Sequence, residues 1–282
     1  MNTKKIILLL QFSILCTIGA FAQIKMPQAS PPSKVAQMAG LTQFNLEYSR
    51  PSMKGRKIFG DLVPFGAVWR TGANAASTLE FDTEVMVEGQ KVDPGKYAIY
   101  TIPEKNEWTV VLSKNTELWG SIGYSKEDDV VRVKVPSKKL KDPLETFEIR
   151  FTDISDTGVT IALAWEKTKA EVRLETEVDP SVMRQIKAQV IDGTPANTGL
   201  YFQAATYYFN NEKDLKQALE WATKVVVEDE KYWNVHLKAK IEQKLGMKEE
   251  AKKSAMRSMA LAKQEKNPDY ITLNEKLLKS IK

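Results

Sequence analysis

The chain has 282 residues, of which 43% are hydrophobic and 27% charged, and its formal net charge is +5. This length gives room for roughly two ordinary domains, and the composition excludes both a wholly disordered chain and a membrane protein with many spans. The sequence contains one Cys and one His, so it can build neither a disulfide framework nor a His-rich zinc site.

Residues 1–22 are typical of a cleaved export signal. Two lysines precede a mostly apolar run over residues 6–18, and a small-x-small pattern follows at residues 20–22. As a helix this run spans roughly 20 Å, which is short of the roughly 30 Å hydrocarbon core of a bilayer. Lipidation at Cys16 is disfavoured, because Leu15 stands where a small residue is expected. We therefore expect an exported protein, periplasmic or secreted, with no transmembrane segment after cleavage.

Two further segments precede the helical part of the chain. Residues 23–41 are rich in Pro, Ser, Gln and Ala, which predicts a leader arm that is extended or loosely docked. Over residues 42–178 apolar residues alternate with period two between turn signals. One such run is Val159, Ile161, Leu163 and Trp165. Eight to ten short strands without intervening helices predict an antiparallel β-sandwich or barrel.

The apolar period changes at Asp179 and Pro180, which suit the cap and first turn of a helix. The expected helices span residues 180–191, 196–210, 214–228, 231–245, 248–264 and 268–280. A weak repeat appears among them, because Ala218, Ala222 and Val226 recur about 33 positions later as Ala251, Ala255 and Met259. Residues 179–282 are therefore expected to form an all-α domain of tetratricopeptide-like helical hairpins, and the whole chain an α+β protein of two domains.

The segment over residues 48–74 combines cations and aromatic residues with few strand patterns. We expect a long loop between strands, and such loops are usually functional or disordered; the aromatic residues argue against disorder. The cations, which have Asp61 as their sole nearby acid, are Arg50, Lys54, Arg56, Lys57 and Arg70. If they converge near Asn74, their donors suit a carboxylate, sulfate or phosphate. In the structural alternative, Arg50 and Arg70 pair with acids of neighbouring strands, namely Glu47, Glu80 and Asp82.

A second loop, between strands expected to end near residue 113 and to begin near residue 130, carries Trp119 and Tyr124. Exposed aromatic side chains on loops stack against sugar rings or against the side chains of a partner. Alternatively, the Trp beside Gly120 plugs the end of the sandwich. The sequence leaves both interpretations open.

Enzymatic chemistry has few candidates. After signal cleavage no Cys nucleophile remains, and His236 lies beside an apolar helical stripe, where a packing or surface role is expected. Neither a phosphate loop nor a dinucleotide-binding glycine pattern is present. The best acid/base pair is Asp61 with Glu47, which would make the protein an envelope hydrolase acting on a glycan, with Arg70 fixing a charged substituent. We expect no cofactor and no metal.

Four stretches of the sequence resemble a known family: residues 46–51, 54–60, 68–74 and 94–110. They are similar to the family named only domain of unknown function twenty-nine eleven, whose members are exported bacterial β-rich proteins, several with helical repeats after the domain. The resemblance covers about residues 30–167. It implies the fold and export, and it supplies no catalytic residue.

These observations favour a non-catalytic binding or scaffolding protein over a hydrolase. Its β-domain would hold an anionic small molecule or a glycan on the loop over residues 50–74, with Trp119 and Tyr124 as further candidate contacts. Its helical domain would bind a protein partner or brace the sandwich. Nucleic acid is excluded as a partner, because neither half of the chain carries the strongly basic charge that such binding requires.

Overall fold

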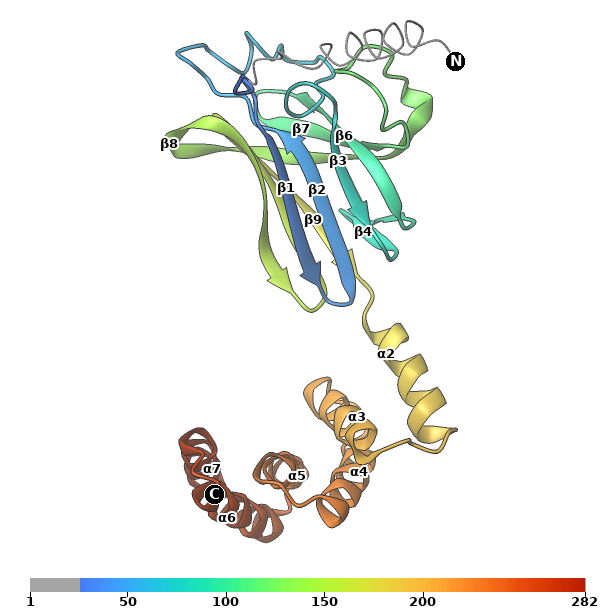
Figure 1. Cartoon of the computed structure of the whole chain (residues 1–282), viewed down its shortest axis with the longest axis vertical. Helices are drawn as coiled ribbons and strands as arrows, with labels where there is room; N and C mark the ends of the chain where they lie inside the picture. The colour runs from blue at the N-terminus through green and yellow to red at the C-terminus, as the bar shows by residue number, and fades with distance from the viewer. Residues whose placement is uncertain (1–25, 282) are drawn as a thin grey trace, which may run out of the picture. The chain divides into compact units, whose positions relative to one another are not determined.

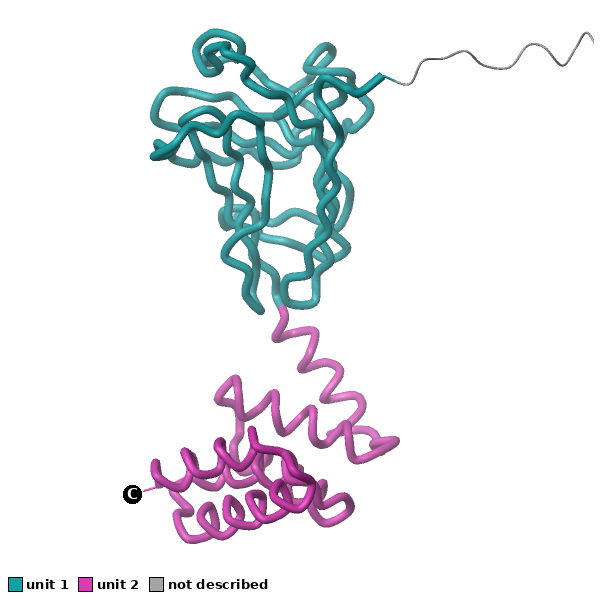
Figure 2. Tube along the Cα trace, turned by 60° about the vertical axis from the view of Figure 1, so that its left-hand side comes forward, with its two compact units in different colours: residues 1–177 teal, residues 178–282 magenta. Residues whose placement is uncertain are grey.

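The computed structural model describes residues 26–281. They fall into two compact units, which meet between Glu177 and Val178 and are called here the β-rich unit and the helical unit (Figure 2). The predicted export signal and the first residues of the leader arm lie outside the described residues. Within the described part, no helix is long and apolar enough to cross a membrane.

The β-rich unit contains nine antiparallel strands in one hydrogen-bonded order, β1-β2-β3-β6-β7-β8-β9-β4-β5 (Figure 1). The strands are β1 (Pro32–Ala39), β2 (Thr42–Ser49), β3 (Ser77–Phe81), β4 (Val85–Val87), β5 (Gln90–Val92), β6 (Gly95–Pro103), β7 (Glu107–Ser113), β8 (Asp129–Ser155) and β9 (Gly158–Thr176). A short 3₁₀ helix, η1 (Lys126–Asp128), precedes β8. The predicted antiparallel β architecture is confirmed.

The long strand β8 lets this sheet fold over on itself. Its first part, up to Pro136, pairs with β7, and the part from Ser137 onward pairs with β9 across several register shifts. Aromatic rings of β2 therefore meet rings of β8, which is not its neighbour in the strand order. Phe44 lies 6.1 Å from Phe151, measured between ring centroids. All nine strands contribute to the single apolar core that the folded sheet encloses.

Part of the predicted leader arm is a strand. Residues 32–39 form β1, which pairs along its full length with β2 through a turn at Gly40 and Leu41. Of the two predicted forms, extended or loosely docked, these residues are extended, and they are paired with β2. The proline residues at the start of this segment made its weak apolar alternation difficult to recognise. In that alternation Val35 packs against the core and the opposite face of the strand is exposed. An edge strand needs little apolar character, because it covers the core with only one face.

The helical unit begins directly after the sheet. Its elements are α2 (Asp179–Ile186), the π-helical turn η2 (Lys187–Ile191), α3 (Thr198–Asn210), α4 (Leu215–Glu228), α5 (Tyr232–Lys244), α6 (Lys248–Gln264) and α7 (Pro268–Ser280). These agree with the predicted helices to within a residue or two. The Asp214 carboxylate caps α4 by accepting hydrogen bonds from the backbone N–H groups of Lys216 and Gln217.

Small residues line the contacts between these helices. The repeated alanines, Ala218 and Ala222 on α4 and Ala251 and Ala255 on α6, are all buried. His236 is half-buried on α5, and its Nδ1 lies 2.8 Å from Oδ1 of Asn274 on α7. This position agrees with the packing or surface role that the sequence predicts for His236.

Candidate functional site

The long loop between β2 and β3, residues 50–76, is fastened to the sheet at several points. The backbone N–H of Met53 donates to the carbonyl oxygen of Glu145 on β8 at 2.8 Å. Trp69 exchanges two backbone hydrogen bonds with Thr101 of β6, at 2.8 and 2.9 Å. Ile58 is buried in the core. The loop is therefore an ordered part of the β-rich unit, and its side chains have defined positions.

A cluster of aromatic rings supports this loop from below. Trp69 stacks on Trp165 of β9 with ring centroids 5.9 Å apart and an interplanar angle of 19°. Phe147 meets Trp69 edge-on at 5.1 Å. The indole N–H of Trp69 donates to the carbonyl oxygen of Gly72 at 3.1 Å, so the ring is held in one orientation. Such packed aromatic pairs add about 0.5–1.5 kcal/mol each beyond the area they bury.

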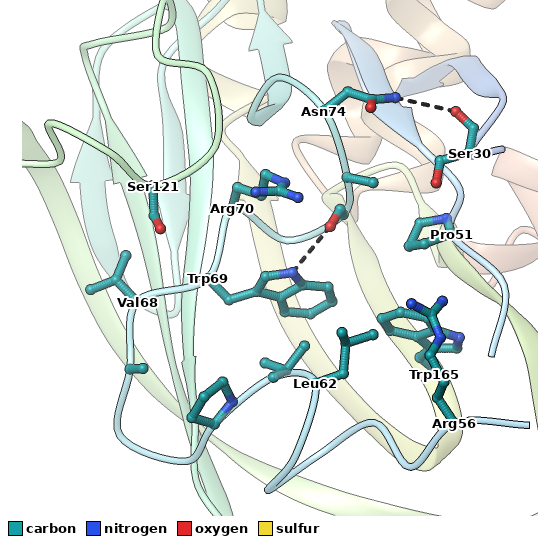
Figure 3. A pocket seen from close by; sticks show the side chains of 15 residues that line it. Ser30, Pro51, Arg56, Leu62, Val68, Trp69, Arg70, Asn74, Ser121 and Trp165 are labelled. Atoms are coloured by element: carbon teal, nitrogen blue, oxygen red, sulfur yellow. Dashed lines mark hydrogen bonds between the residues drawn. The ribbon is translucent and has the colours of Figure 1, made fainter. Parts of the chain in front are cut away.

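A cavity of about 470 Å³ opens above this aromatic cluster, and we call it the loop cavity (Figure 3). This is within the range of roughly 300–1,000 Å³ that is usual for small-molecule sites. Its apolar wall includes Pro51, Leu62, Val63, Pro64, Val68, Trp69 and Trp165. Its polar side chains are Ser30, Arg56, Arg70, Asn74 and Ser121. The lining among residues 26–281 contains two arginines and no carboxylate.

Arg70 is the most unusual of these residues. Its side chain is partly buried, and its Nε lies out of reach of solvent without any hydrogen-bond partner in the described structure. Gly120 packs directly against it, because a Cβ built on that glycine would stand 2.9 Å from Nη1 of Arg70. Gly120 has a φ of +77°, which also favours glycine. The fold thus leaves room for a guanidinium group, and no acid among residues 26–281 pairs with it.

Arg56 and Asn74 also line the loop cavity. Arg56 is oriented by two backbone carbonyl oxygens, because its Nε donates to Met53 at 2.9 Å and its Nη2 to Ser52 at 2.7 Å. Asn74 donates from Nδ2 to the Ser30 carbonyl oxygen at 3.3 Å. Figure 3 shows Arg70 and Arg56 on either side of the Trp69 indole. The two guanidinium groups therefore border one cavity from different segments of the same loop.

The other three predicted cations do not line the loop cavity. Arg50 is directed to the backbone, with its Nε donating to the Phe147 carbonyl oxygen at 3.2 Å. Lys54 and Lys57 are exposed. Among residues 26–281 none of the five loop cations forms an ion pair with a carboxylate. The alternative in which Arg50 and Arg70 pair with acids of neighbouring strands is therefore wrong for the described residues.

The two predicted aromatic contacts have different positions. Trp119 is 69% exposed, so the interpretation of Trp119 as a core plug is wrong. Tyr124 packs against Tyr100 with ring centroids 4.9 Å apart, and its hydroxyl donates to the Asp129 carboxylate at 2.8 Å. Burial, together with this hydrogen bond, raises the pKa of Tyr124 to about 12. The Tyr124 hydroxyl is already engaged within the fold, whereas Trp119 faces solvent beside the loop cavity.

The acid/base pair considered for hydrolysis is not at the loop cavity. Glu47 accepts a hydrogen bond from Lys34 of β1 at 2.7 Å, and this contact lowers the pKa of its carboxyl group. Asp61 is exposed, and neither acid lines the loop cavity. Within residues 26–281 there is also no group of three or more His, Cys, Asp or Glu side chains that could hold a metal ion. The geometry therefore gives the hydrolase alternative no support.

Sequence reasoning missed several residues that shape the loop cavity. Trp165 belongs to an alternating strand and was expected only in the core, and Ser30 and Ser121 lie far from the loop in sequence. Trp69 belongs to residues 68–74, one of the stretches that carry the family resemblance. No neighbouring residue in the sequence indicates that its side chain lines a cavity. Such residues meet only because the sheet folds over.

The comparisons with known proteins agree with the β-rich unit. Residues 30–174, just over half of the chain, match the family described as "Protein of unknown function (DUF2911)". The chain belongs to this family. The match ends within β9, so the helical unit lies outside the region that defines DUF2911. No curated protein and no solved structure matches the chain.

Proposed function

We propose that the β-rich unit of this DUF2911 protein is a non-catalytic binding module that holds an anionic ligand in the loop cavity. The observation that carries the proposal is Arg70, a partly buried guanidinium group whose Nε has neither a hydrogen-bond partner nor an acid among the described residues. The hydrogen bonds of Arg56 to the loop backbone place a second cation at the same cavity. A carboxylate, sulfate or phosphate group would receive donors from both.

The arrangement has a cost that a structural role does not explain. A buried N–H without a partner costs about 1–3 kcal/mol, and more when the group is charged. A side chain retained for stability would be paired or replaced by an apolar one. Residues that lower stability are typical of functional sites.

The rest of the lining favours a ligand with an apolar face. The partly exposed Trp69 indole, backed by the buried Trp165, offers a flat and rigid contact surface, while the charged and polar side chains lie around it. Such sites orient a ligand through a few polar contacts and bury its body against apolar walls. An organic anion fits this combination better than a bare inorganic ion.

The helical unit would then have the second role in the same exported protein. Stacked helical hairpins present extended surfaces that bind other proteins or support a neighbouring domain. We propose that this unit holds a protein partner or braces the β-rich unit. The regular pairing of its helices by small residues supports a rigid scaffold.

Arg70→Met tests the binding role. The change keeps an unbranched side chain as far as the position of Nε and removes the guanidinium charge, so we expect anion binding to fall at least tenfold while the melting temperature stays constant or rises. The measurement is isothermal titration calorimetry with citrate, a sugar phosphate and a uronic acid, accompanied by thermal unfolding of the same samples.

Arg150→Met is the matched control, because Arg150 is an exposed arginine on β8 and does not line the loop cavity. Its binding should equal that of the unmodified protein. If Arg70→Met unfolds the β-rich unit instead, Arg70→Lys decides between the roles, since it keeps the charge but loses the forked donors. Unchanged binding in a folded Arg70 variant would refute the proposal.

A further inference from the structure

We infer that the ligand is an acidic glycan chain, with one acidic sugar in the loop cavity and the adjoining sugar stacked on the exposed indole of Trp119. This inference rests on the proposed function and extends it from an anion to a polymer. Nothing in the DUF2911 description assigns either position.

The chemistry of the loop cavity matches an acidic sugar. A uronic acid carries a carboxylate, several hydroxyl groups and a ring face made of C–H bonds. Arg70 and Arg56 provide donors for the carboxylate, and the hydroxyl and amide groups of Ser30, Asn74 and Ser121 suit hydroxyl groups. The Trp69 wall suits the C–H face. A uronic acid uses all three kinds of contact at once.

The backbone of Trp119 is joined to the loop that walls this cavity. Trp119 forms a β-bridge with Ala75, and the N–H of Gly120 donates to the carbonyl oxygen of Asn74 at 3.1 Å. Gly120 touches the Arg70 side chain, and Ser121 lines the cavity itself. Trp119 is thus one residue from a contact with Arg70 and two residues from a lining side chain.

The exposed indole of Trp119 offers a surface that a ligand could cover. A Trp side chain that is 69% exposed on a backbone held by hydrogen bonds leaves a large apolar face in water. The indole is suited to the face of a sugar ring, as are the tryptophans that dominate binding surfaces generally. A monomeric ligand confined to the cavity would leave this ring uncovered, whereas a chain that continues out of the cavity would cover it.

Docking to a membrane is an alternative explanation for the exposed residues of this loop. Ile122 is 84% exposed in the same loop, and exposed lysines lie nearby. The cavity distinguishes the two. Arg70 and Arg56 both line the cavity, so their guanidinium groups suit a ligand that enters it. A flat membrane surface would contact mainly the exposed residues. Ile122 therefore serves as the variant that separates glycan stacking from membrane insertion.

The test compares galacturonic acid with its linear hexamer by isothermal titration calorimetry, using the mature protein and its Trp119→Ala, Ile122→Ala and Arg70→Met variants. Trp119→Ala should weaken binding of the hexamer about tenfold and leave binding of the monomer within twofold, because only the longer chain reaches the indole. Arg70→Met should weaken both, and Ile122→Ala neither. A neutral glucose hexamer should not bind.

Four results would overturn the inference. Equal loss of monomer and hexamer binding in a folded Trp119→Ala variant would place the indole in the support of the cavity. Binding of citrate without binding of the hexamer would leave the proposed function intact and remove the glycan. Cosedimentation with phosphatidylglycerol vesicles that depends on both Trp119 and Ile122, without hexamer binding, would identify a membrane surface instead. Absence of binding to any anion would refute the proposed function as well.

Discussion

The long loop of the β-rich unit and the helical unit treat charged side chains in different ways. Elsewhere the β-rich unit also pairs its charges, as Lys34 does with Glu47. In the helical unit cations face acids, as where Arg257 binds Glu230 through two hydrogen bonds of 2.9 and 2.5 Å and Lys213 binds Asp179 at 2.8 Å. In the β-rich unit the five cations of the long loop have no such partners among the described residues. Ion pairs between exposed side chains contribute little to the free energy of unfolding. We therefore interpret the lack of such pairs in the loop as a feature of function. Paired charges are internally satisfied, and unpaired ones remain available to a ligand.

The apolar cores of the two units also differ in the size of the side chains that build them. The β-rich unit rests on large rings, with Trp69, Trp108 and Trp165 packed beneath the loop cavity. Much of the helical unit is held by alanines that let helices approach closely. A rigid aromatic base can hold a loop and its cavity in position, whereas close helix packing produces a regular surface without a deep polar cavity. The following changes test this contrast, in order of expected effect.

Removing Trp165 should have the largest effect. Trp165 is 1% exposed, stacks on Trp69 and donates from its indole N–H to the Glu145 carbonyl oxygen at 3.1 Å. We expect Trp165→Ala to destabilise the β-rich unit by about 3–5 kcal/mol and to abolish ligand binding, because the base of the cavity is lost. Thermal unfolding followed by near- and far-ultraviolet circular dichroism should show an earlier β transition and an unshifted helical one. Simultaneous early loss of both signals would show that the units unfold as one.

Enlarging an alanine should affect the helical unit alone. Ala255 on α6 is fully buried, so Ala255→Leu forces the helices apart and should cost about 1–3 kcal/mol. Ala260 is exposed on the same helix, which makes Ala260→Leu the matched control with little expected change. Urea unfolding followed by helical circular dichroism measures both. Anion binding by the β-rich unit should persist in each variant, and its loss in Ala255→Leu would contradict the independence of the two units.

The smallest expected effect is a dependence on alkaline pH that the two units share. Burial and a hydrogen bond to an aspartate raise the pKa of both Tyr124, next to Asp129, and Tyr207, next to Asp179, to about 12. Because these values exceed the ordinary value of 10.0, the stabilisation is complete below pH 10 and is lost as the pH rises toward 12. Tyr124→Phe should cost about 1 kcal/mol at neutral pH and weaken the alkaline loss for the β-rich unit only. Melting temperatures between pH 8 and 12 provide the check, and an unaltered pH profile would contradict it.

The helices could be predicted closely because their signals are local. The Asp214 cap, the Asn267 cap with Pro268 after it, and the apolar spacing of each helix all act within a few residues. The strand β6 was harder to recognise, since its residues do not simply alternate. Tyr97 and Ile99 face the main core, while Ala98 and Tyr100 are covered on the other side by a second apolar cluster. A strand buried on both faces loses the period of two on which its prediction depends.

By itself, the sequence determined the β-rich and helical classes of the two parts, the position of the change between them and the presence of an ordered loop rich in cations. These properties follow from the spacing of apolar residues, from helix capping and from composition. Each of these depends only on residues that are close together in the sequence. Only the tertiary structure decided that Arg56 and Arg70 border one cavity, that Arg50 is used by the backbone of β8 and that Trp119 is exposed whereas Tyr124 is packed. Those outcomes depend on contacts between segments far apart in the chain, and no local pattern encodes which distant residues will meet when the sheet folds over.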